Sequence, residues 1–154
     1  MNQLIQSDLS LILPEIFLLS MAMVVLMTDL FIKPSMRWII FALSQFTLLG
    51  GAYLTGQHFN HQTEFAFSNM FVRDGLADFL KMISYAGTSL IFFYSRSYMK
   101  DRNLYRGEYF SLVLFALLGM MIMISSHNML LVYMGLELLS LCLYSLTALD
   151  RDNQ

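Results

Sequence analysis

Residues 129–149 read MLLVYMGLELLSLCLYSLTAL, an apolar run in which Glu137 is the only charged side chain. The core of a bilayer is about 30 Å thick, so a helix needs about 20 mostly apolar residues to cross it. This stretch has that length and contains no proline that would interrupt a helix. It therefore predicts a transmembrane helix with one carboxyl group in its interior.

Four further stretches of similar character precede it, at residues 11–32, 36–56, 76–95 and 109–124. The connectors between them have the composition of turns. Lys33-Pro34-Ser35, for example, separates the first two stretches, because proline has no N–H and clashes with the preceding helical turn. We therefore predict an all-α membrane protein with five transmembrane helices, which form a single membrane domain over residues 1–154.

The composition supports this class and argues against others. Hydrophobic residues make up 57% of the chain and charged residues 13%, against about 25% charged residues in a typical soluble domain. The net charge of −2 offers no basic surface for nucleic acid. One cysteine and three scattered histidines predict neither an internal disulfide nor a zinc-type metal site.

The distribution of lysine and arginine predicts the orientation, because positive loops stay on the cytoplasmic side. Seven of the nine basic residues fall on one side of the predicted spans, only Arg73 falls on the other, and Lys81 lies inside a span. We therefore expect an outside N-terminus and a cytoplasmic C-terminus. The seven residues are Lys33, Arg37, Arg96, Lys100, Arg102, Arg106 and Arg151.

Several charged residues fall within or near the ends of the spans. Asp78 and Lys81 are three residues apart, so they share one face of the third helix, about 10 Å from its start in the case of Lys81. One interpretation is a self-neutralising pair whose lysine stem extends outward to water. The other is a step in an ion pathway. Glu15 and Asp29 lie near the two ends of the first span, where we expect them to reach the interface.

Glu137 is different, because it lies near the middle of its span with no cation in the same helix. Tyr133, Ser140 and Tyr144 lie on roughly the same helix face and make a narrow polar stripe. An ionisable group at this depth is a candidate functional site, and a carboxyl group there can take up and release a proton. The alternative is a protonated carboxyl that holds helices together by hydrogen bonds to these neighbours.

The residues around Glu137, NMLLVYMGLELLSL at 128–141, closely resemble the sequence around the buried glutamate of subunit N of bacterial NADH–quinone oxidoreductase. This enzyme is respiratory complex I, and the mitochondrial counterpart of the subunit is NADH dehydrogenase subunit 2. The opening Leu13-Pro14-Glu15-Ile16 and the segment Asp74-Gly75-Leu76 are similar to the same subunit.

The resemblance implies an antiporter-like proton channel in the membrane arm of the complex, built from two inverted five-helix repeats. It implies a proton-transfer role for Glu137. It also implies that the partners of the chain are the other membrane-arm subunits of complex I and the lipid bilayer of the bacterial inner (plasma) membrane. NADH, flavin, iron–sulfur clusters and quinone are expected in the rest of the complex, with no cofactor in this chain. In that family the glutamate pairs with a lysine on a later helix.

Two features depart from the family pattern. The sequence ends at Gln154, before the helices that carry the family's intramembrane lysines, so the expectation is a chain that corresponds to the first third of the subunit and is inactive alone. Cys142 stands where relatives commonly have proline, which puts a local kink after Glu137 in doubt.

Two alternatives stay open at this point. The membrane subunit of a cation/proton antiporter or of a membrane-bound hydrogenase would share the fold. A structural membrane protein without a transport role would use Glu137 only to hold helices together, and a change of Glu137 to glutamine would then be harmless.

Overall fold

The computed structural model describes residues 9, 11–32, 38–57, 63–67, 69–101 and 107–149, with the side chains of 97–101 excepted. Five of the seven basic residues used for the orientation, together with the side chain of a sixth, Lys100, therefore lie outside the described part. Those five are Lys33, Arg37, Arg102, Arg106 and Arg151.

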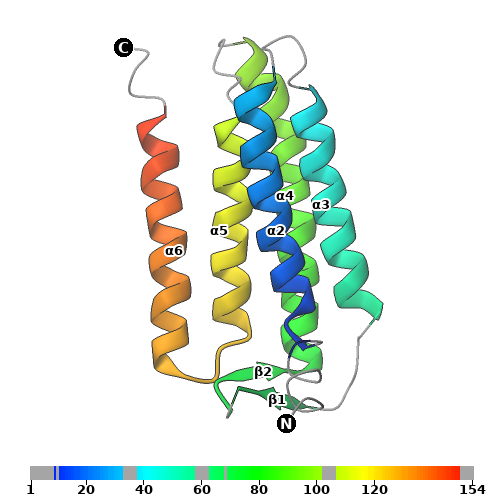
Figure 1. Ribbon diagram of the computed structural model, residues 1–154, viewed down its shortest axis with the longest axis vertical. Helices are drawn as coiled ribbons and strands as arrows, with labels where there is room; N and C mark the ends of the chain where they lie inside the picture. Colours follow the sequence, from blue (N-terminus) through cyan, green and yellow to red (C-terminus); the bar gives the residue numbers. More distant parts are fainter. Residues whose placement is uncertain are drawn as a thin grey trace.

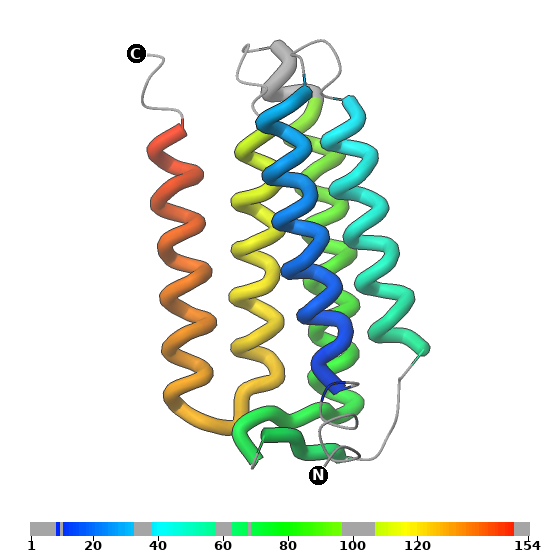
Figure 2. Tube along the Cα trace, in the orientation of Figure 1, coloured from blue at the N-terminus to red at the C-terminus, as the bar shows by residue number. Residues whose placement is uncertain are grey.

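The described chain is a bundle of helices closed at one end by a small hairpin (Figure 1). The helices are α2 (Leu13–Phe31), α3 (Trp38–Gln57), α4 (Gly75–Asp101), α5 (Glu108–Ile124) and α6 (Met129–Ala148), and the strands are β1 (Glu64–Ala66) and β2 (Phe71–Arg73). The prediction of five helices is confirmed for the residues that the structure describes. Successive helices run in opposite directions, so that α2 begins at the hairpin end and α6 finishes at the other (Figure 2).

α4 is longer than its predicted span over residues 76–95, whereas α5 begins and ends within one residue of its predicted span over residues 109–124. α4 continues six residues beyond residue 95, because the polar residues there contain no helix breaker and Arg96 stacks over the Phe41 ring, 4.6 Å from its centroid. α5 has 17 residues, whereas the other four helices are long and apolar enough to cross a membrane.

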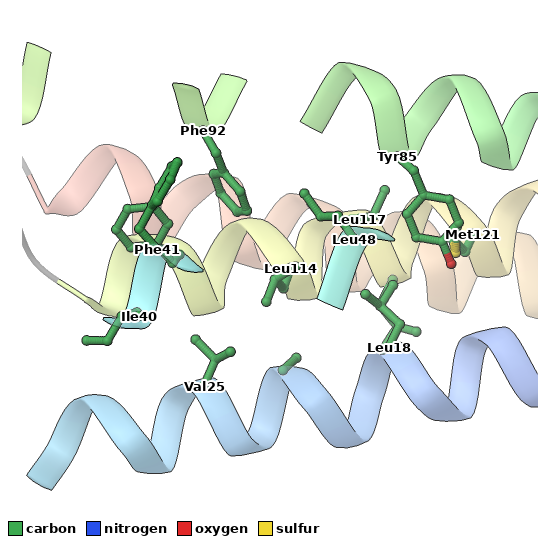
Figure 3. Packing of buried hydrophobic residues seen from close by; sticks show 13 residues of the cluster. Leu18, Val25, Ile40, Phe41, Leu48, Tyr85, Phe92, Leu114, Leu117 and Met121 are labelled. Atoms are coloured by element: carbon green, nitrogen blue, oxygen red, sulfur yellow. The ribbon is translucent and has the colours of Figure 1, made fainter. Parts of the chain in front are cut away.

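The core of the bundle lies around α5, which contacts α2, α3, α4 and α6. Eight of its 17 residues are buried, including Leu114, Leu117 and Met121. Figure 3 shows these side chains meeting Leu18 and Val25 of α2 in the interior. At the end away from the hairpin the core is aromatic, and the rings of Phe92 and Phe110 lie 5.1 Å apart. Burial of these apolar side chains between helices holds the four inner helices together.

The hairpin joins α3 to α4 and also ties the turn between α5 and α6 to the bundle. Its antiparallel strands pair Glu64 with Arg73, and its turn contains Asn69 at a positive φ of 66°. The Val72 N–H donates to the Ser125 carbonyl over 2.8 Å, and the His127 N–H donates to the Met70 carbonyl over 2.9 Å. α6 therefore begins from a fixed position, and the Asn128 side chain caps it by accepting from the Leu130 N–H.

Candidate functional site

The position of α6 is set by close packing against α5. Gly119 of α5 and Gly135 of α6 face each other so closely that a Cβ on either residue would lie 2.8 Å from the other's carbonyl oxygen. Small residues at such a crossing let two helix backbones approach, which is a common device in membrane bundles. Gly135 and Cys142 are the buried residues of α6. They are seven residues apart and therefore mark one helix face, which packs on α5.

Glu137 lies on the opposite side of α6 because of this packing. Two residues along an α-helix correspond to a rotation of about 200°, so a side chain two positions after Gly135 points away from α5. The structure agrees, because Glu137 is exposed. It forms no ion pair with any residue that the structure describes. The uncovered face thus carries a carboxyl group halfway along a membrane-spanning helix.

The predicted polar stripe is present but does not form a hydrogen-bonded cluster. Tyr133 and Tyr144 are 62% and 69% exposed on the same uncovered side. The Ser140 hydroxyl donates instead to the backbone, to the Leu136 carbonyl over 2.6 Å and to the Glu137 carbonyl over 3.2 Å. The interpretation in which neighbours on α6 hold the Glu137 carboxyl by hydrogen bonds therefore finds no support in this part of the chain.

The predicted pairing of Asp78 with Lys81 is wrong. Arg73, at the end of β2, donates from Nε to both oxygens of Asp78, over 3.1 and 3.2 Å. Lys81 instead pairs with Glu15 of α2, with 2.5 Å between Nζ and Oε1. Lys81 is also fully buried, so its stem does not extend to water. Each of these four buried charges has its partner on another element, as buried charges require.

The two ion pairs at the hairpin end form a second charged site, and the sequence did not predict that Glu15 and Arg73 belong to it. Glu15 lies in the first turn of α2, as expected, but it is only 7% exposed and faces α4 rather than the interface. Its partner Lys81 is 66 positions away in the sequence, so periodicity within one helix cannot reveal the pair. The buried charges at this end balance, since they are two acids, Glu15 and Asp78, and two bases, Arg73 and Lys81.

Asp29, at the far end of α2, lies against the start of α5. A Cβ on Gly107 would come within 1.8 Å of the Asp29 Oδ1 atom. A carboxylate at this place is favourable, because the first N–H groups of a helix carry partial positive charge. The structure thus distributes the four acids of the spans considered above, with Glu15 and Asp78 at the hairpin end, Glu137 near the middle of α6 and Asp29 at the opposite end.

These features define the class of the protein, a helical protein with four helices long and apolar enough to cross a membrane and with charged side chains along them. Comparison of the sequence with known proteins identifies relatives within this class. The chain is 53% identical over 150 residues to subunit N of NADH-quinone oxidoreductase from Methylovorus glucosotrophus, an alignment that covers 97% of this chain and 31% of the relative. It is 50% identical over 146 residues to the same subunit from Thioalkalivibrio sulfidiphilus, covering 95% of this chain and 30% of that one.

A more distant relative gives the same result. Subunit N from Ruthia magnifica is 41% identical over 155 residues, covering 99% of this chain and 32% of its own length. No family model matches the chain. The resemblance to subunit N that the residues around Glu137 predicted is thus confirmed along nearly the whole chain, which spans about 30% of the length of these curated relatives.

Proposed function

We propose that the chain acts as part of a proton-translocating membrane-arm subunit of NADH–quinone oxidoreductase, in which electron transfer from NADH to quinone is coupled to proton movement. The similarity to subunit N supports this assignment. In the proposal, this chain supplies helices and a proton-binding group. Other subunits of the complex supply the NADH and quinone sites, the flavin and the iron–sulfur clusters.

The observation that carries the proposal is the position of Glu137 on the uncovered face of α6. A charged carboxylate against lipid is unfavourable, so this face is better suited to protein or to a hydrated path than to hydrocarbon. A nearby cation favours the charged carboxylate. Moving the carboxyl group away from the cation into a dry environment favours the neutral acid. A carboxyl group that alternates between these two surroundings binds a proton in one and releases it in the other.

The orientation is part of the proposal. The seven-to-one distribution of basic residues supports placing the hairpin outside and the end of α6 in the cytoplasm of a bacterial inner membrane. A topology reporter inserted in the hairpin should therefore be active only outside, and one fused after Gln154 only in the cytoplasm. The opposite pattern would reverse the orientation.

The direct test places this sequence in a subunit of its relatives' full length, assembled into the complex, and changes Glu137 to glutamine. We expect NADH oxidation coupled to quinone to fall, whereas flavin reduction and transfer to an artificial acceptor stay normal. Glu108→Gln is the matched control, since Glu108 is an exposed acid at the start of α5. Normal quinone-coupled turnover in Glu137→Gln would favour the structural alternative.

A further inference from the structure

A second group of polar side chains lies inside the hairpin end of the bundle, away from Glu137. It consists of Glu15 on α2, Lys81 and Tyr85 on α4, and Thr55 on α3, each of which is buried. Lys81 Nζ contacts Glu15 Oε1 on one side and lies 5.4 Å from the centroid of the Phe71 ring on the other. Tyr85 points from α4 into the interior (Figure 3), where its hydroxyl packs against Gly51.

Two polar atoms of this group are buried without a hydrogen-bond partner within the described part of the chain. They are Oε2, the second oxygen of Glu15, and the Tyr85 hydroxyl. The Thr55 hydroxyl beside Tyr85 donates its proton to the Gly51 carbonyl over 2.9 Å, so toward Tyr85 it can act only as an acceptor. Buried polar groups of native proteins are satisfied by protein or by internal water, so two such atoms in one polar cluster mark a place for water.

Few charged residues of the described chain face Glu15. α4 brings Lys81, and Asp78 is already paired with Arg73 from the hairpin. α3 has no charged residue along its length, and the only charged residue of α5, Glu108, lies at the opposite end of the bundle. Lys81 is therefore the one cation of the described residues that pairs with the Glu15 carboxyl group.

We propose that Glu15, Lys81 and Tyr85 form a hydrated proton-exchange site at the hairpin end of the bundle, with one water molecule joining Glu15 Oε2 to the Tyr85 hydroxyl. In the exchange, hydronium transfers a proton to Oε2, which forms the neutral carboxylic acid and leaves water. Lys81 stays an ammonium ion throughout. The reverse transfer restores the ion pair. The site works without any contribution from Glu137.

The test uses the 154-residue chain in lipid nanodiscs. Brief X-ray radiolysis in ¹⁸O-labelled water marks aromatic rings that lie beside bound water. We expect Tyr85 to acquire the label, whereas Phe92, which is equally buried but lies in the apolar core, should not. Infrared difference spectra on acidification from about pH 8 to about pH 4 then follow the C=O stretch of protonated carboxyl groups, since an unperturbed glutamic acid titrates near pH 4.3.

Three variants assign the infrared signal. Glu137→Gln should keep the Glu15 band, and Lys81→Met should show it already at neutral pH because the cation is gone. The double variant Glu15→Gln/Lys81→Met should lose it, and this variant leaves no unpaired charge that would prevent folding. A band identical in the wild type and the double variant, or a Tyr85 as unlabelled as Phe92, would overturn the proposal in favour of a dry structural clamp.

Discussion

Glu15 and Glu137 are both carboxylates on membrane-spanning helices, but their surroundings are opposite. Glu15 is buried at the contact of α2 with α4 and is paired with Lys81. Glu137 is exposed on the side of α6 that faces away from the bundle and has no ion-pair partner in the part of the chain that the structure describes. A buried charge with an ion-pair partner inside the bundle helps to hold the helices together. A charge on an uncovered face within the membrane needs a partner from other protein segments or from water.

The same contrast separates the two helices that pack most closely. α5 buries eight of 17 residues, but α6 buries two of 20 and rests on α5 through a glycine contact. The four inner helices thus enclose a core, and α6 presents a long apolar face with Glu137 at its middle. If this arrangement is correct, changes at the enclosed Glu15–Lys81 pair should reduce stability, whereas changes at the exposed Glu137 should not.

The largest expected effect is at the enclosed pair. Glu15→Ala leaves the Lys81 ammonium buried without its partner, and we expect the free energy of unfolding to fall by about 3–5 kcal/mol. Denaturation in mixed micelles measures the change. Glu137→Gln is the control and should change the stability by less than about 1 kcal/mol, because its side chain is exposed. Equal losses in the two variants would remove the distinction between the sites.

The next largest effect is at the contact of α5 with α6. Gly135→Ala places a methyl group against the Gly119 carbonyl, so α6 must move outward at a loss of about 1–3 kcal/mol. Cys142, the single cysteine of the sequence, faces α5 and should then react faster with a maleimide. Gly87→Ala is the matched control, because a Cβ there meets no atom within 4 Å, and it should leave the reaction rate unchanged.

The distinction between these sites was only partly predictable from the sequence. Hydropathy and length located the helices, and the position of Glu137 within one apolar run identified it as unusual, because both properties are local. The partner of Lys81 was predicted wrongly, since the nearest acid in the helix, Asp78, is taken by Arg73 of the hairpin. Which charges meet is decided by how α2, α4 and the hairpin pack, and no spacing within one segment contains that information.

A smaller effect is expected at the opposite end from the hairpin. Gly107→Ala introduces a Cβ where the Asp29 carboxylate lies, and the carboxylate must turn away from the first turn of α5. Loss of such a favourable charge near a helix N-terminus costs about 0.3–1 kcal/mol, which is measurable in the same denaturation experiment. The double change Gly107→Ala/Asp29→Asn should cost little beyond Asp29→Asn alone. Full additivity of the two changes would indicate that they act independently.

The smallest effect is expected at Ser140, which neighbours Glu137. Its hydroxyl bonds the helix backbone rather than the carboxyl group, so Ser140→Ala should change the stability by no more than about 0.5 kcal/mol. In a subunit of the relatives' full length it should also leave quinone-coupled turnover near the wild-type rate. A loss as large as that of Glu137→Gln would show that the serine takes part in proton transfer.

The most direct test of the proton-transfer role of Glu137 is the number of protons pumped for each NADH oxidised, measured with a pH-sensitive dye in inverted membrane vesicles. The complex would carry this sequence in a subunit of its relatives' length, as the wild type, Glu137→Gln or Glu108→Gln. We predict a lower proton yield for Glu137→Gln and an unchanged yield for Glu108→Gln. A wild-type yield in the Glu137→Gln complex would contradict a proton-transfer role for the carboxyl group on the open face of α6.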